Sequence, residues 1–197
     1  MTALEKFEQD LLDLIGKPTD LRPFVCDGSP LTHKVFIVGF NPATEMSADF
    51  WEFWRAGYGF DKQAWFDAYL KERQGRPLKL GKTRRPAVSN TRRVIDWILQ
   101  AAHPIKCLET NIYSVPTERA SDLAPEPWMT KPFDFLLEAV KPDLVIVHGK
   151  EAAKALLKGK KIEAKVIPFR HFSRGWSEEA ARELGRVLRE CAAIRGQ

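Results

Sequence analysis

The distribution of apolar residues along the chain predicts strands that alternate with helices. Unbroken apolar runs at 35–38 and 144–147 are typical of buried strands. Residues 107–112 and 165–168 are two further strand candidates. Because such alternation indicates a parallel sheet between helices, we predict an α/β fold in three α/β/α layers, with these four strands parallel.

Apolar residues at helical spacing predict the helices between those strands. The pattern favours helices at 3–15, 90–102, 133–140 and 150–158, and a last helix that follows Ser177. A chain of 197 residues is long enough for one sizeable core, so we predict a single domain spanning 1–197.

Two stretches show no regular period. Residues 50–70 are crowded with aromatic side chains, and we expect short helices around the turn at Gly57–Gly59. Residues 71–86 contain two glycines and two prolines, which predict a loop.

Positive charge is concentrated in one segment. The chain carries a net charge of +5, whereas residues 71–93 alone carry nine Lys or Arg and one acid, a charge of +8. Such a segment is either a phosphate-binding face or a solvated charged face, and composition does not separate the two.

Composition narrows the class of protein. The hydrophobic fraction of 44% and the charged fraction of 29% are typical of a globular domain. No apolar run approaches the ~18 residues of a membrane span, and the N-terminus lacks a signal-peptide pattern. Three widely spaced cysteines (Cys26, Cys107 and Cys191) indicate reduced thiols. We therefore expect a cytoplasmic protein, and a monomer.

Polar residues follow three of the predicted strands. Asn41 comes after the first, Asn111 lies at the end of the second, and His171 follows the fourth. The carboxyl ends of parallel strands meet at one edge of a sheet, where ligands bind in open α/β folds. We therefore expect these three side chains to converge.

Four segments resemble, in the same order, motifs of the uracil-DNA glycosylase superfamily. They are Gly-Phe-Asn-Pro-Ala at 39–43, Thr-Asn-Ile-Tyr and the residues after it at 110–123, Pro-Asp-Leu-Val-Ile-Val-His-Gly-Lys at 142–150, and His-Phe-Ser at 171–173. The Asn of the first segment is similar to that of the mismatch-specific and single-strand-selective branches. The resemblance implies strand order 2-1-3-4 and hydrolysis of the N-glycosidic bond of uracil, or another deaminated base, in DNA.

The resemblance also implies roles for individual residues. His171 would donate to the departing base and Asn41 would orient the attacking water, so both are candidate catalytic residues. Asn111 would pair with the base. The other candidates for substrate binding are Gly39, Phe40, Phe53 and Ser173, and those for DNA binding are Arg84, Arg85, Arg92, Arg174 and Trp176.

Each of these residues also has a structural alternative. Asn41 can close its loop in an Asx-turn, Asn111 can cap a strand, and His171 can be a hydrogen-bonded structural residue. Phe53 can belong to the core. We take His148, at the end of the third strand, to be structural.

Two departures from the superfamily pattern concern the last motif. Phe172 replaces the usual Pro, and Gly175 stands where several members have a side chain that intercalates into DNA. Arg174 or Trp176 would then have to fill that role.

The sequence contains no spacing typical of a metal site, and three cysteines are too few for the four-cysteine iron–sulfur cluster of some branches. We expect no metal and no cofactor, with DNA as the partner. Two other functions remain open: a non-catalytic nucleic-acid-binding member of the same fold, and an α/β hydrolase acting on free nucleosides.

Overall fold

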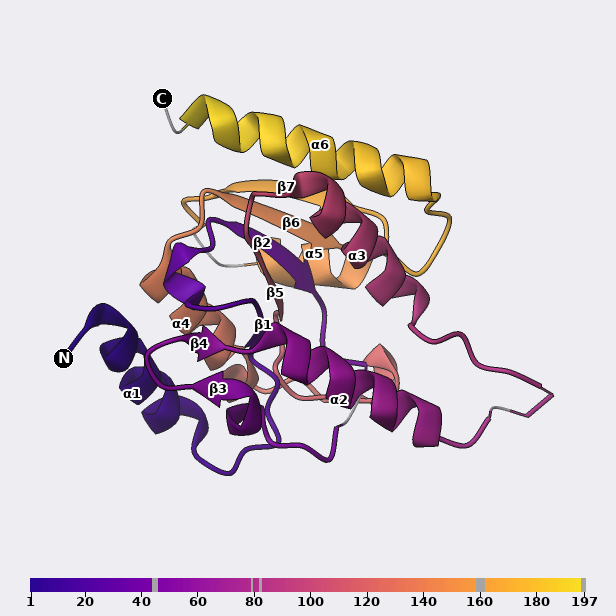
Figure 1. The fold of residues 1–197 in the computed structure, drawn as a ribbon, viewed down its shortest axis with the longest axis horizontal. Helices are drawn as coiled ribbons and strands as arrows, with labels where there is room; N and C mark the ends of the chain where they lie inside the picture. Colours follow the sequence, from indigo (N-terminus) through magenta and orange to yellow (C-terminus); the bar gives the residue numbers. More distant parts are fainter. Residues whose placement is uncertain (44–45, 79, 82, 159–161, 196–197) are drawn as a thin grey trace. The chain divides into compact units, whose positions relative to one another are not determined.

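The computed structural model describes residues 1–43, 46–78, 80–81, 83–158 and 162–195 (Figure 1). Side chains from 191 onward, including Cys191, and the basic residues Lys79 and Lys82 lie outside this description. The chain divides into two compact units, each built from two segments. Unit 1 comprises Met1–Lys62 and Lys106–Arg170, and unit 2 comprises Gln63–Ile105 and His171–Gln197. The single domain and its three layers stay predictions.

Unit 1 is built around a five-stranded mixed sheet, which confirms the α/β class. Its strands are β1 (Phe24–Val25), β2 (Val35–Gly39), β5 (Cys107–Asn111), β6 (Leu144–His148) and β7 (Lys165–Phe169), in the order β1-β5-β2-β6-β7. Strands β5, β2, β6 and β7 correspond to the four predicted ones and are parallel. Because β1 adds an antiparallel fifth strand at the edge, the prediction of a four-stranded, wholly parallel sheet was wrong.

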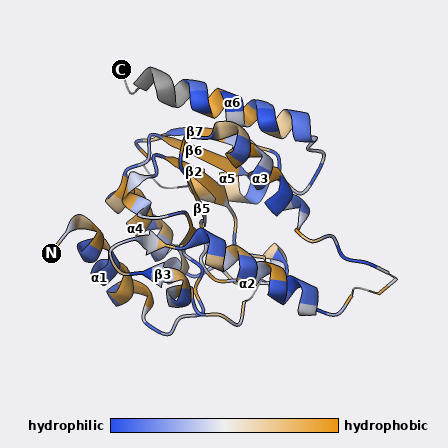
Figure 2. Cartoon of the chain, viewed as in Figure 1, coloured by the Kyte–Doolittle hydropathy of each residue, from blue (hydrophilic) through white to orange (hydrophobic). Residues whose placement is uncertain are grey.

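The two central strands are apolar along their length, as Figure 2 shows. All five residues of β2 and all five of β6 are buried. Burial on both faces explains their continuous apolar runs, because a strand covered on both sides has no solvent-facing positions. The parallel pairs are in register, with Val35 opposite Cys107 and Gly39 opposite Asn111.

Three helices belong to unit 1. Helix α1 (Ala3–Ile15) begins with a capping box between Thr2 and Glu5, buries one apolar face and ends at Gly16. It packs against α4 (Lys131–Val140). Helix α5 (Lys150–Leu157) follows β6. These bounds confirm the predicted helices to within two residues.

The aromatic stretch forms a small cluster in unit 1. A 3-10 helix, η2 (Phe50–Phe53), leads into a two-stranded hairpin of β3 (Trp54–Arg55) and β4 (Gly59–Phe60). Phe50, Phe24 and Phe60 contact one another with ring centroids 5.2–5.8 Å apart. The expected short helices are confirmed in part: η2 precedes the turn and a helix begins at Lys62, but the turn at Gly57 itself joins two short strands.

Unit 2 contains helices α2 (Lys62–Gly75), α3 (Asn90–Ala102) and α6 (Glu178–Arg195). Helix α2 extends into the region predicted to be a loop, because residues up to Gly75 are good helix formers. Helices α3 and α6 pack together closely at Gly185, where a Cβ would lie 2.4 Å from the carbonyl oxygen of Ile98.

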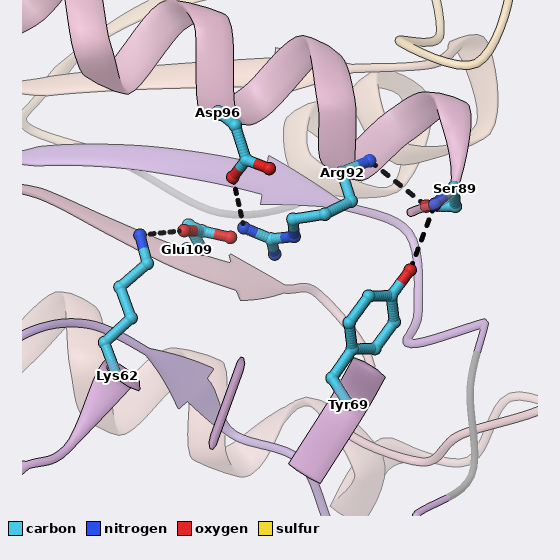
Figure 3. A network of polar contacts seen from close by, with 6 residues as sticks. All are labelled: Lys62, Tyr69, Ser89, Arg92, Asp96 and Glu109. Atoms are coloured by element: carbon cyan, nitrogen blue, oxygen red, sulfur yellow. Dashed lines mark hydrogen bonds and ion pairs between the residues drawn. The ribbon is translucent and has the colours of Figure 1, made fainter. Parts of the chain in front are cut away.

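Within unit 2, polar contacts tie α2 to the start of α3 (Figure 3). Ser89 caps α3 by accepting a hydrogen bond from the backbone of Arg92, and its own N–H donates to the hydroxyl of Tyr69. The guanidinium of Arg92 lies 5.0 Å from the ring centroid of Trp65.

No helix in the described part of the chain is long and apolar enough to cross a membrane.

Unit 1 contains an ion pair at a buried position on β5. Lys62 donates to the carboxylate of Glu109 at 2.7 Å, and the two side chains are 25% and 6% exposed (Figure 3). Removing one partner of a buried ion pair typically costs about 3–5 kcal/mol.

We predict that Lys62→Met lowers the free energy of unfolding by about 3 kcal/mol, at the lower end of that range because Lys62 is partly exposed. Urea denaturation measures the change. The control is Lys6→Met, which breaks a solvent-exposed pair with Asp10 and should cost less than about 1 kcal/mol. Equal losses in the two variants would contradict the assignment of Lys62–Glu109 as a buried ion pair.

Candidate functional site

Three strands of unit 1 end side by side, and their last residues form a row. Asn111 of β5 lies opposite Gly39 of β2, and β6, the other neighbour of β2, ends at His148. A Cβ built on Gly39 would lie 2.4 Å from Oδ1 of Asn111 and 3.3 Å from Nε2 of His148. Both side chains therefore approach Gly39 closely from the two neighbouring strands, and the approach of Asn111 is possible because Gly39 has no side chain.

Asn111 is well placed to bind a ligand. Its side chain is half-buried, and within the described ranges no hydrogen bond engages its carboxamide. One acceptor and two donors are therefore available at the strand end. This observation favours the base-pairing role over the strand-capping alternative.

His148, which we took from the sequence to be structural, lies beside Gly39. It is 6% exposed, and its Nε2 lies 3.3 Å from the position of a Cβ built on Gly39. The sequence marks it only as the last residue of the clearest apolar run. We add it to the candidate residues of this row.

Beyond the strand ends, the chains after β2 and β5 continue side by side. The N–H of Ile112 donates to the carbonyl oxygen of Gly39, and the N–H of Tyr113 donates to that of Phe40. The rings of Phe40 and Tyr113 meet edge to face, 5.0 Å apart. Both side chains are half-buried, so each keeps some accessible surface close to Asn111.

Asn41 makes structural hydrogen bonds, chiefly to the loop that follows β5 and not in an Asx-turn of its own loop. Its amide nitrogen donates to Oγ1 of Thr117 at 2.6 Å and to the carbonyl oxygens of Val115 and Pro42 at 3.4 Å each. These contacts use the nitrogen end of the carboxamide only. The oxygen end remains available as an acceptor, so the loop-closing role does not exclude a role in orienting water.

Unit 2 carries His171 and Ser173, whose contacts define the state of the imidazole. The backbone N–H of Ser173 donates to Nδ1 of His171 at 3.1 Å, and the hydroxyl of Ser173 lies 2.7 Å from the same nitrogen. A nitrogen that accepts a hydrogen bond carries no proton, so the proton of the neutral ring is on Nε2. In the neutral ring of His171, Nε2 is therefore the nitrogen that can donate.

The surroundings of His171 favour the neutral ring. Partial desolvation, and secondly the positive charge of Arg174, lower the pKa of His171 below its ordinary value of 6.5. The neutral form therefore dominates at pH 7. The corresponding contribution to stability is present above pH 6.5 and is lost as the pH falls through the lowered pKa.

Several predicted site residues have structural contacts. Phe53 is 7% exposed and packs against Phe60, so it belongs to the aromatic core, and stacking on a base does not fit its burial. Phe172, 1% exposed, anchors the 171–176 loop of unit 2 and meets the ring of Trp176 at 5.0 Å. This burial explains why a large apolar residue occupies position 172.

The predicted DNA-binding arginines differ in accessibility. Arg84 and Arg174 are exposed. Arg85 donates to the backbone carbonyl oxygens of Arg73 and Pro77, which orders its loop. Arg92 is 9% exposed and pairs with Asp96 at 3.5 Å, so we leave it out of the proposed DNA contacts.

Within the described ranges, no group of three or more His, Cys, Asp or Glu side chains is arranged to hold a metal ion. Cys26 and Cys107 are buried free thiols, and burial raises the pKa of Cys107 to about 12. Neither is therefore a reactive thiolate at neutral pH.

No protein-family model matches the chain, and no curated protein matches it.

We predict that Gly39→Ala displaces the Asn111 side chain. The atom nearest to the new methyl group is Oδ1, the end of a side chain that can rotate, so the cost in unfolding free energy should stay near 1 kcal/mol. The side-chain amide signals of Asn111 in an NMR spectrum should shift. Gly75→Ala is the control, because open space surrounds Gly75. Unmoved Asn111 signals in Gly39→Ala would contradict the close approach.

A second prediction concerns the titration of His171. An NMR titration of the folded protein should give a pKa below 6.5, and Arg174→Gln should raise it because a neighbouring positive charge is removed. Arg186→Gln, on α6 and paired with Glu183, should leave it unchanged. A pKa at or above 6.5 in the unmodified protein would show that His171 is not held neutral.

Proposed function

We propose that this protein is a DNA glycosylase of the uracil-DNA glycosylase superfamily, which hydrolyses the N-glycosidic bond of uracil or another deaminated base. The observation that carries the proposal is the register of β2 with β5. Gly39 lies opposite Asn111, so the loop bearing Asn41 and the free carboxamide of Asn111 are at the same edge of one sheet. Polar groups at that edge are in the usual position for a ligand of an open α/β sheet.

The proposed reaction is a substitution by water at the sugar. The water oxygen forms a bond to C1′ while the bond between C1′ and the base nitrogen breaks, and both bonding electrons leave with the base. The proton of the water passes to solvent. Positive charge develops on the sugar and negative charge on the base, and donors aimed at the base lower the barrier.

Each candidate residue has a part in this reaction. The available oxygen of Asn41 accepts a hydrogen bond from the water and orients it, although an amide is too weakly basic to remove its proton. Asn111 offers an acceptor and two donors to the base edge. The Nε2–H of His171 supplies the donor for the base anion, and the proposal requires the loop at 171–176 to reach the edge where Asn41 lies.

Contacts to DNA are assigned to the exposed arginines, Arg84 and Arg174. Affinity gained by neutralising phosphates is available only on a polyanion, which favours a nucleic acid over a free nucleoside. A target base in duplex DNA has to be flipped out, at a cost of a few kcal/mol.

One observation favours a second candidate, a non-catalytic nucleic-acid-binding protein of the same fold. The amide nitrogen of Asn41 donates hydrogen bonds to Val115 and Thr117, which are contacts expected of a purely structural residue. The two candidates share the DNA contacts and differ in whether base release occurs.

Base release is the test. The protein is incubated with single- and double-stranded oligonucleotides containing uracil, hypoxanthine or xanthine, and alkali then cleaves the abasic sites. We predict that Asn41→Ala and His171→Ala each lower the single-turnover rate by about 100–1,000-fold, because each removes a group that acts in the transition state. DNA affinity should change by less than about tenfold.

The matched control is His103→Ala, which removes an exposed histidine at the end of α3 and should cleave at the wild-type rate. Wild-type rates in both Asn41→Ala and His171→Ala would make these residues structural and the assignment of this site wrong. DNA binding without release of any base would favour the second candidate.

A further inference from the structure

The carboxamide of Asn41 is held by one side chain, and that side chain is Thr117. The distance from Nδ2 of Asn41 to Oγ1 of Thr117 is 2.6 Å, the shortest of the three contacts that the nitrogen makes. The other two acceptors are the backbone carbonyl oxygens of Val115 and Pro42, at 3.4 Å. Thr117 therefore contributes the best hydrogen bond to this group.

The direction of that hydrogen bond follows from the next contact in the chain. The hydroxyl of Thr117 donates to the carbonyl oxygen of Arg119 at 2.7 Å. Its only proton is thus engaged, and Oγ1 faces Asn41 as an acceptor. An acceptor at this point selects the NH₂ end of the carboxamide and disfavours the flipped orientation, in which two oxygens would face each other.

The backbone holds Thr117 in place independently of its hydroxyl. The N–H of Thr117 donates to the carbonyl oxygen of Pro42 at 3.0 Å, which joins the two loops directly beside Asn41. A substitution that removes only the hydroxyl therefore leaves the loop anchored.

The orientation of the amide nitrogen also determines where the amide oxygen, Oδ1 of Asn41, lies. With the nitrogen held by three acceptors, Oδ1 of Asn41 is the end of the carboxamide that these contacts do not use. Among the described residues, no hydrogen bond occupies this oxygen. It is an acceptor with a defined direction, which is the property needed to hold a water molecule for attack.

We propose that Thr117 is a positioning residue: it fixes the orientation of the Asn41 carboxamide so that Oδ1, and not the NH₂ group, faces the reacting water. This inference rests on the proposed glycosylase function. Thr117 itself touches neither the base nor the water, and it acts through Asn41.

Three variants test the assignment. Thr117→Val keeps the shape of the side chain and removes the acceptor, whereas Thr117→Ser keeps the hydroxyl. Thr32→Val is the matched control, because the hydroxyl of Thr32 donates to the carbonyl oxygen of Ser29 at 2.9 Å in a separate 3-10 helix (Pro30–Thr32). The measurements are the single-turnover rate on a uracil oligonucleotide and the equilibrium affinity for the same DNA.

We expect Thr117→Val to lower the single-turnover rate by about tenfold, the effect of one net hydrogen bond, while DNA affinity stays within about twofold. Thr117→Ser should restore the rate to within about threefold of wild type, and Thr32→Val should match wild type. If Thr32→Val lowers the rate as Thr117→Val does, the cause is a general loosening of the fold. If Thr117→Ser does not restore the rate, the hydroxyl is not what matters. Either result would overturn the proposal.

A readout without catalysis separates this inference from the proposed function. The NMR signals of the Asn41 side-chain NH₂ should shift in Thr117→Val and stay in place in Thr32→Val. Unshifted signals overturn the positioning role whatever the rates are. If the wild-type protein cleaves and Thr117→Val cleaves equally fast, only the inference about Thr117 is wrong. If the wild-type protein releases no base, the proposed function fails and the role of Thr117 fails with it.

Discussion

The in-register parallel pairing of β2 with its neighbours β5 and β6 is the constraint on which the candidate site depends. Side chains alternate across a strand, so a slip of one residue would turn Asn111 to the opposite face of the sheet. The register places it beside Gly39 and across from His148. Because β2 and β6 are buried on both faces, the apolar core of unit 1 holds this register and thereby holds the polar row at its edge.

Local hydrogen bonds orient two further candidate residues, one in each unit. In unit 1, Asn41 is oriented by Thr117, and in unit 2, Ser173 determines which nitrogen of His171 carries the proton. In both cases a neighbour in sequence or a crossing loop fixes one end of a small polar group. Such preorganisation is the main means by which proteins stabilise charge that develops during a reaction.

The elements with a strong apolar period were predictable, and the short ones were not. Helix α1 and strands β2 and β6 follow from burial on one or both faces. Strand β1 has only two residues, Phe24–Val25, which are too few to show a period. The contact between Asn41 and Thr117 joins residues 76 positions apart, so no local pattern predicts it. His148 was visible as a strand end, but its approach to Gly39 depends on the register.

We propose that Asn41, Asn111 and His171 act on one base. A crystal structure with an oligonucleotide containing 2′-fluoro-2′-deoxyuridine, whose glycosidic bond resists hydrolysis, tests it most directly. The account predicts a flipped uracil with its edge on the Asn111 carboxamide, Nε2 of His171 within hydrogen-bond distance of a base carbonyl, and a water on Oδ1 of Asn41. A base bound elsewhere, or His171 turned away from it, would contradict the account.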